Sequence, residues 1–134
     1  MLLDSLLTTF CREFDHIAVP QKNPQGVYPL PVNAEVEVAI SALDPGFYLL
    51  APIVPLPEAK THEALFIYLM RANFLGASTG RTIIGLDPSE KQITLSFAYS
   101  KEPSYPTFCE SLETFVNYLS FWRKEIPRYQ QTFL

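Results

Sequence analysis

Apolar residues near the start of the chain recur at spacings of three and four, the period of a helix with an apolar face. The residues that follow this spacing are Leu3, Leu7, Phe10, Phe14 and Ile17, and Leu2 and Leu6 extend the apolar surface onto a second face. Pro20 and the polar run after it end the pattern. The spacing therefore predicts a first helix over about 2–16.

The next apolar segment, Val27 to Val32, predicts a strand at the edge of a sheet. It contains Pro29 and Pro31, which lack the backbone N–H that a strand donates to its neighbour. Because the two prolines are two residues apart, both missing donors lie on the same side of the strand. A central strand does not tolerate this loss, so we expect the segment at a sheet edge.

Two further strands continue an antiparallel meander. From Glu35 to Leu43, apolar and polar residues alternate with the period of a strand that has one exposed face. Asp44-Pro45-Gly46 predicts a turn, since proline fixes φ and glycine accepts backbone conformations that other residues avoid. The following strand, Phe47 to Val54, is apolar almost throughout, and a proline-rich stretch ends it.

A second helix, predicted over about 58–75, is apolar around most of its circumference. One stripe consists of Leu65, Leu69 and Ala72, and another of Phe66, Met70 and Phe74, together with Ile67. A helix that is apolar all round must be buried on both sides. In a chain of 134 residues, a partner can cover one of those sides.

The rest of the chain predicts a hairpin and a final helix. Two strands, Arg81 to Leu86 and Gln92 to Tyr99, flank the turn at 87–90, and the last helix covers about 106–126. The order α-β-β-β-α-β-β-α predicts an α+β fold in which helices cover a twisted antiparallel sheet. The length fits one domain over 1–134.

Composition narrows the classes of function. Hydrophobic residues make up 48 % and charged residues 18 %, which excludes a disordered chain. The net charge is -4, and the 10 lysines and arginines form no cluster, which argues against nucleic-acid binding and a polybasic membrane anchor. Apolar runs are too short to insert in a membrane. Since Asp4 stands where a secretory signal carries basic residues, we expect a cytoplasmic protein.

Little in the sequence points to catalysis or to a bound cofactor. Neither Cys11 nor Cys109 has a histidine at a motif spacing, as an activated thiol requires. The two cysteines with His16 and His62 also lack the short paired spacing of a zinc site. We therefore expect reduced, packed thiols, no metal, no cofactor and no enzyme activity.

A known family shows the same order of elements. The most similar stretch is Leu65-Phe66-Ile67-Tyr68-Leu69-Met70-Arg71-Ala72-Asn73, followed by Gly80 and by Ile84-Gly85-Leu86-Asp87. It resembles the Leu-rich helix, helix-ending asparagine, glycine-containing loop and Gly-Leu-Asp strand end of the class I type III secretion chaperones, the family named after the Tir chaperone. The resemblance covers residues 2–126. The chain departs from the family pattern at Pro29 and Pro31, and in the proline-rich segment 52–57.

The resemblance implies a dimeric sandwich that acts as a chaperone in the bacterial cytoplasm. Such a protein binds the non-globular N-terminal segment of one or more secreted effectors and keeps it soluble and competent for secretion, without hydrolysing a nucleotide. A homodimer is the expected assembly, and a heterodimer with a related chaperone is also known in the family.

The resemblance and the apolar pattern together suggest two sets of binding residues. In the family, the second helix forms much of the dimer interface, so we expect the interface to contain Phe66, Ile67, Met70 and Phe74. Effectors bind in grooves beside the first helix and the sheet, so we expect an effector-binding groove made by Leu2, Leu6, Phe10, Val36, Val38 and Phe47.

Two alternatives stay open. The same fold can serve as a regulatory subunit that binds a folded partner, such as another chaperone subunit or a transcription or secretion regulator. A small α+β enzyme is the other alternative, and it requires an activated nucleophile or an acid–base pair.

Overall fold

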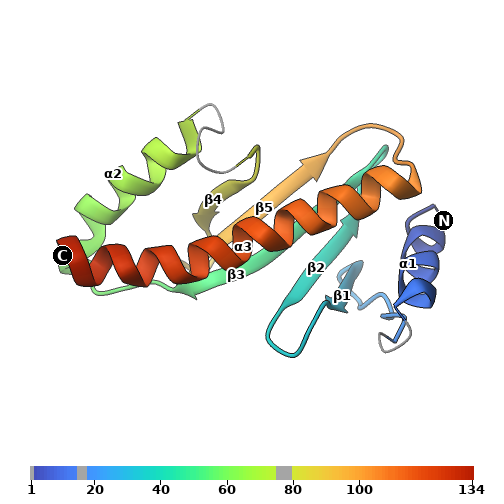
Figure 1. The fold of residues 1–134 in the computed structure, drawn as a ribbon, viewed down its shortest axis with the longest axis horizontal. Helices are drawn as coiled ribbons and strands as arrows, with labels where there is room; N and C mark the ends of the chain where they lie inside the picture. The colour runs from blue at the N-terminus through green and yellow to red at the C-terminus, as the bar shows by residue number, and fades with distance from the viewer. Residues whose placement is uncertain (1, 15–17, 75–79) are drawn as a thin grey trace. The chain divides into compact units, whose positions relative to one another are not determined.

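The predicted order of elements is observed in the computed structural model, which describes residues 2–14, 18–74 and 80–134 (Figure 1). The helices are α1 (Leu2–Glu13), α2 (His62–Asn73) and α3 (Tyr105–Phe133), with a short 3-10 helix, η1 (Ala59–Thr61), before α2. The strands are β1 (Val27–Pro31), β2 (Glu37–Ala42), β3 (Phe47–Pro55), β4 (Ile83–Leu86) and β5 (Gln92–Tyr99). They form one sheet in the order β1-β2-β3-β5-β4.

The sheet is antiparallel, as the sequence predicts. Tyr28 lies opposite Ile40 in the β1–β2 pair, and β2–β3 and β4–β5 are also antiparallel. For β3 and β5, Leu56 just after β3 donates its N–H to the carbonyl of Lys91 just before β5, at 2.9 Å. β1 has one neighbour, β2, so the prediction of a proline-containing edge strand is confirmed.

The chain divides into two compact units. The first contains residues 1–50 and 98–114, and the second contains 51–97 and 115–134. Each unit therefore takes part of β3, β5 and α3. That the chain acts as one domain stays a prediction.

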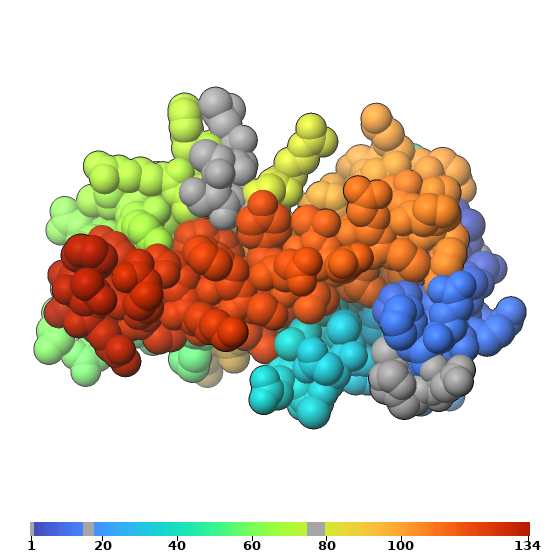
Figure 2. Space-filling model, in the orientation of Figure 1, coloured from blue at the N-terminus to red at the C-terminus, as the bar shows by residue number. Residues whose placement is uncertain are grey.

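Aromatic residues join the helices to the sheet in the first unit. The Phe108 ring of α3 meets Phe47 of β3 edge-on, with centroids 5.2 Å apart, and Phe10 of α1 at 6.3 Å. The hydroxyl of Tyr105 donates to the carboxylate of Glu13 at 2.6 Å, which ties the end of α1 to the start of α3. Figure 2 shows these two segments side by side, α1 in blue and the start of α3 in orange.

The second unit packs α2 against the C-terminal part of α3. The hydroxyl of Tyr68 donates to Glu125 at 2.5 Å, and the Tyr68 ring stacks on Tyr129, with centroids 4.0 Å apart. Arg128 donates to the same carboxylate at 2.6 and 2.8 Å. Burial and the Glu125 hydrogen bond raise the pKa of Tyr68 to about 12, while Arg128 and Tyr68 lower the pKa of Glu125 to about 2.

Those contacts explain why the predicted end of the last helix was wrong. α3 continues through Pro127 to Phe133, beyond the expected end near 126. A proline inside a helix removes one backbone hydrogen bond. Here the ring of Tyr129, two residues after the proline, stacks on Tyr68 of α2, and the helix continues to Phe133.

Side chains and backbone turns also shift other boundaries. β2 begins at Glu37 instead of 35 because Asn33 Oδ1 accepts the N–H groups of Glu35 and Val36, which holds this stretch in a turn. β4 begins at Ile83, since Arg81 has a φ of 76° and cannot extend the strand. η1 occupies the predicted first turn of α2. The expected helix residues at 15–16 and 75, and Ile17, lie outside the described residues.

Candidate protein-binding surfaces

The first candidate surface lies on α2 and β4 in the second unit. α2 buries Leu65, Leu69 and Ala72, whereas Met70 and Phe74 are 70% and 69% exposed. A cleft of about 200 Å³ opens beside them, lined by Phe66, Leu69, Met70, Asn73, Ile84, Gly85, Leu86 and Ile93. We use the name α2–β4 surface for Phe66, Met70 and Leu86, which line this cleft, together with the exposed Ile67 and Phe74, which lie three residues before and four residues after Met70.

This surface contains all four residues expected at a dimer interface. Ile67, Met70 and Phe74 are exposed, and Phe66 is half-buried with its ring stacked on His62 at 5.0 Å. The residues that line the cleft include no charged side chain. Leu86 was not among the residues expected at this interface, although it lies two residues after Ile84 and therefore on the same face of the strand.

Asn73, the last residue of α2, covers the outer edge of β4. Its side-chain Nδ2 donates to the carbonyl of Ile84 at 2.8 Å, and its Oδ1 accepts the N–H of Ile84 at 2.9 Å. These two bonds reproduce the pairing that a neighbouring strand would make. They therefore occupy the backbone groups of Ile84 that face away from β5.

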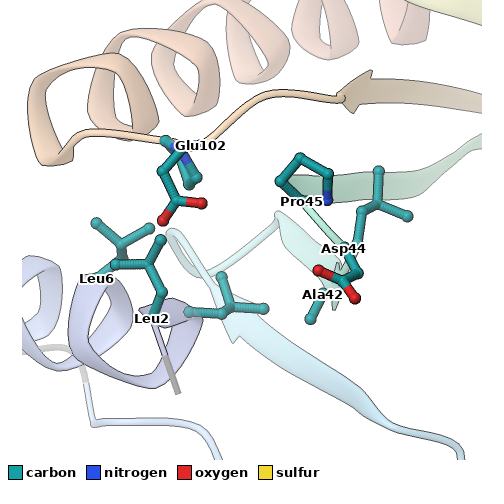
Figure 3. Close-up of a pocket in the computed structure, with 10 residues that line it drawn as sticks. Leu2, Leu6, Ala42, Asp44, Pro45 and Glu102 are labelled. Carbon is teal, nitrogen blue, oxygen red and sulfur yellow. The ribbon is translucent and has the colours of Figure 1, made fainter.

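The second candidate surface is a pocket in the first unit, which we call the α1 pocket (Figure 3). Its volume is about 390 Å³, and its lining consists of Leu2, Leu3, Leu6, Ala42, Leu43, Asp44, Pro45, Gly46, Glu102 and Pro103. Leu2 is 44% exposed, whereas Leu6 is buried. Figure 3 shows the carboxylate of Glu102 directed toward Leu2 and Leu6, with Asp44 on the β2–β3 turn at the other side.

Gly46 fixes the turn that forms one wall of the α1 pocket. Its φ is +110°, and a Cβ built there would lie 1.7 Å from the backbone oxygen of Tyr99. The N–H of Leu43 donates to the carbonyl of Gly46 at 2.9 Å and closes the turn. Only glycine fits this position, and the predicted Asp44-Pro45-Gly46 turn is confirmed.

The six residues expected to form an effector groove do not share one surface. Leu2 and Leu6 line the α1 pocket. The other four are buried in the chain itself: Phe10, Val36, Val38 and Phe47. Helical or strand spacing identifies an apolar face but does not distinguish a core from a groove. Asp44 and Glu102 were not among the expected groove residues, and both are acids beside prolines in connections between elements.

The outer edge of β1 offers few hydrogen-bond donors. Val27 exchanges backbone bonds with the loop, because its carbonyl accepts the N–H of Asn23 at 2.8 Å and its N–H donates to Asn23 Oδ1 at 3.0 Å. The backbone N–H and C=O of Val27 therefore point away from β2. The backbone groups of Pro29 and Pro31, two and four residues later, point the same way. Neither proline has an N–H to donate.

A proline also lies in β3 where the strand extends past β2. The β2–β3 pairing ends at Leu50, and Pro52 follows. The guanidinium of Arg123 on α3 donates to the carbonyl of Pro52 at 2.8 and 3.3 Å. Pro52 has no N–H to donate and its carbonyl already accepts from Arg123, so this residue offers little to another strand.

The described residues contain little that suggests catalytic chemistry. Burial raises the pKa of the Cys11 thiol, which disfavours the reactive thiolate. Cys109 is half-buried and reduced. Within residues 2–14, 18–74 and 80–134, no group of three histidine, cysteine, aspartate or glutamate side chains could hold a metal ion. No helix in those ranges is long and apolar enough to span a membrane.

Comparison with known proteins decides the family. The family model of the Tir chaperone protein (CesT) family matches residues 5–123. The chain belongs to this family. The matched residues contain the whole α2–β4 surface and all of the α1 pocket except Leu2 and Leu3. The resemblance to type III secretion chaperones drawn from the sequence is thus confirmed.

Relatives and solved structures extend the similarity along the chain. The Chlamydia pneumoniae protein CPj0713/CpB0740 is 26% identical over 126 residues, which cover 93% of this chain and 96% of that protein. A structure of the HopA1–SchA chaperone–effector complex matches with a TM-score of 0.68 and 14% identity, covering 91% of this chain and 93% of that chain. YbjN, described as a putative transcription regulator from E. coli, matches with a TM-score of 0.71 and 17% identity, covering 96% and 93%. At these identities, the two structures establish the α+β fold alone.

Proposed function

We propose that this protein is a cytoplasmic bacterial chaperone that binds the non-globular N-terminal segment of one or more secreted effectors and keeps it competent for type III secretion. The observation that carries this proposal is the match to the Tir chaperone family over residues 5–123. The similarity to a chain from a chaperone–effector complex supports it. The exposed apolar side chains are a second support, since a chaperone for unfolded segments needs surface that is not already covered.

In this proposal, a second copy of the chain covers the α2–β4 surface. In a dimer with a twofold axis, each surface meets its own copy, so it must be complementary to itself. An apolar surface without charged side chains in its cleft meets this condition. A related chaperone with the same surface would fit equally, and the mass of the assembly distinguishes the two.

The effector segment is proposed to bind at the α1 pocket, where Leu2 and Leu6 stand beside the β2–β3 turn. Ordering an unfolded segment opposes binding, and buried apolar area must offset that loss. Phe10, Val36, Val38 and Phe47 then act as the packed support behind the pocket because they are buried.

Co-expression with secreted proteins from the same genome tests this function. We expect one of them to co-purify, with a short N-terminal segment protected from protease while the chaperone is bound. Leu2→Gln should weaken its retention, and Val19→Gln, which changes another exposed apolar residue of the first unit, should not. If no secreted protein co-purifies with the wild-type chain, or the protected region is a folded domain, the proposal fails.

A second candidate is a regulatory subunit that binds a folded partner. The similarity to YbjN, which covers 96% of this chain, favours it. The same co-expression experiment separates the two candidates, because a folded partner would resist protease before and after the chaperone is removed.

A further inference from the structure

The edges of the sheet limit how a segment can bind. A strand added to a sheet edge exchanges N–H and C=O groups with it. At β1, Pro29 and Pro31 have no N–H to offer, and Val27 is already bonded to Asn23. At β4, the side chain of Asn73 occupies both outward groups of Ile84. At these positions a bound segment must rely on side-chain contacts.

The α1 pocket offers such contacts and also carries charge. Asp44 and Glu102 are both exposed at its rim, and the lining residues include no lysine or arginine. Within the described parts of the chain, neither carboxylate makes a hydrogen bond or an ion pair. Leu2 and Leu43, which are both exposed, add apolar surface to the lining of the pocket.

This combination selects one kind of ligand side chain. Lysine and arginine have an apolar stem and a charged head, so they can bury the stem on leucine while the head stays near carboxylates. A second copy of this chain is a poor ligand, because its net charge is -4. The acids would also speed encounter with a basic segment.

We propose that the α1 pocket binds a lysine or arginine of the effector segment, flanked by apolar residues, through Asp44 and Glu102, without strand addition to the sheet. The inference rests on the proposed function and names the chemistry of the segment. The cation approaches Asp44 and Glu102, and its apolar neighbours pack on Leu2, Leu6 and Leu43.

Short labelled peptides test the charge requirement. The probe is Leu-Leu-Lys-Leu-Leu with capped ends, compared with the same peptide in which norleucine replaces lysine. Fluorescence anisotropy should give about 5-fold tighter binding for the lysine peptide at low salt, as two exposed ion pairs allow, and less at high salt. Equal affinity for the two peptides would overturn the proposal.

Charge-removing variants locate the effect. Asp44→Asn with Glu102→Gln should abolish the preference for lysine. Glu110→Gln with Glu113→Gln, which changes two exposed acids of the first unit outside the pocket, should preserve it. A preference that survives in the first double variant, or disappears in the second, contradicts the assignment.

Backbone methylation separates side-chain docking from strand addition. Methylating the leucine amides of the probe removes the donors that a strand needs, and binding should change by less than about 2-fold. Loss of binding would show that the segment pairs with a sheet edge, which contradicts the proposal.

Retention of a co-purified effector tests the cation site separately from the proposed chaperone function. If wild type and Asp44→Asn/Glu102→Gln retain an effector equally, the cation site is wrong while the chaperone function stands. If wild type retains no secreted protein, the function itself fails. Weaker retention by the double variant supports both.

Discussion

The α2–β4 surface and the α1 pocket are both apolar, but only the pocket carries charge. No charged side chain lines the cleft on α2 and β4, whereas Asp44 and Glu102 line the pocket at α1. A twofold contact brings a surface against its own copy, so acids in that surface would face acids. The first surface therefore suits self-association, and the second suits a partner of opposite charge.

The largest expected effect is on self-association. Met70→Asp puts a charge at the centre of the α2–β4 surface, and a twofold contact would bury two such charges. We expect the dimer to weaken by at least about 100-fold, with folding preserved because Met70 is 70% exposed. Sedimentation velocity measures this, with Val19→Asp as the matched control.

A Met70→Asp protein that stays dimeric would remove α2 from the interface. The α2–β4 surface would then no longer be the site of self-association. Circular dichroism of the variant should match the wild type, which shows that any loss of mass comes from dissociation.

The α1 pocket should depend most on Gly46. Gly46→Ala would place a methyl group 1.7 Å from the Tyr99 backbone oxygen and force a positive φ on alanine. We expect the free energy of unfolding to fall by roughly 3 kcal/mol or more. Gly26 has a φ of +82°, and a Cβ built there would have no atom within 4 Å. Gly26→Ala should therefore lower the free energy of unfolding by only about 1 kcal/mol.

Urea unfolding of the two glycine variants checks this difference. If both variants lose the same free energy of unfolding, the positive φ alone accounts for the cost. The turn would then be able to move away from Tyr99. The pocket wall would then be adaptable, and its fixed shape would not explain selectivity.

A smaller effect is expected at the β1 edge. Pro29→Val with Pro31→Val restores two outward N–H groups and creates an edge that another strand can join. We expect concentration-dependent scattering that the wild type lacks at the same concentration. Pro24→Val, in the loop before β1, is the control. An unchanged scattering profile would show that the prolines do not protect this edge.

The smallest effect concerns the contact that holds α2 on α3. Glu125→Gln weakens the bonds from Arg128 and Tyr68 and should lower the free energy of unfolding by about 1 kcal/mol at pH 7. The pKa of Glu125 is lowered from 4.5 to about 2 in the folded chain. Its stabilisation is therefore present above pH 4.5 and is lost as the pH falls toward 2.

Thermal unfolding of wild type and Glu125→Gln across pH 2 to 7 measures that loss. The difference in unfolding temperature between the two proteins should disappear near pH 2, since a protonated glutamate resembles glutamine. A gap that is constant with pH would mean that the carboxylate charge does not support the second unit.

Local patterns predicted much of the fold. Hydrophobic spacing gave the order of elements, and Pro29 and Pro31 gave the position of β1 at the edge. These features depend on neighbours in sequence. The extension of α3 past Pro127 depends on Tyr68, which lies far away in the chain, so local rules could not reveal it.

The candidate sites were less accessible to sequence reasoning. Phe66, Ile67, Met70 and Phe74 could be named because a helix that is apolar around most of its circumference has more apolar surface than its own core can cover. Val38 and Phe47 have the same spacing as groove residues would, yet they are buried. Burial depends on which helix covers each face of a strand, and period alone does not carry that information.

Light scattering of the purified chain, alone and bound to a co-expressed secreted protein, tests the central claim most directly. The account predicts a mass near twice 15.2 kDa for the chain alone, and the same dimer plus one effector chain in the complex. A stable mass of 15.2 kDa, with the effector bound to a single copy, would contradict the assignment of α2 to self-association.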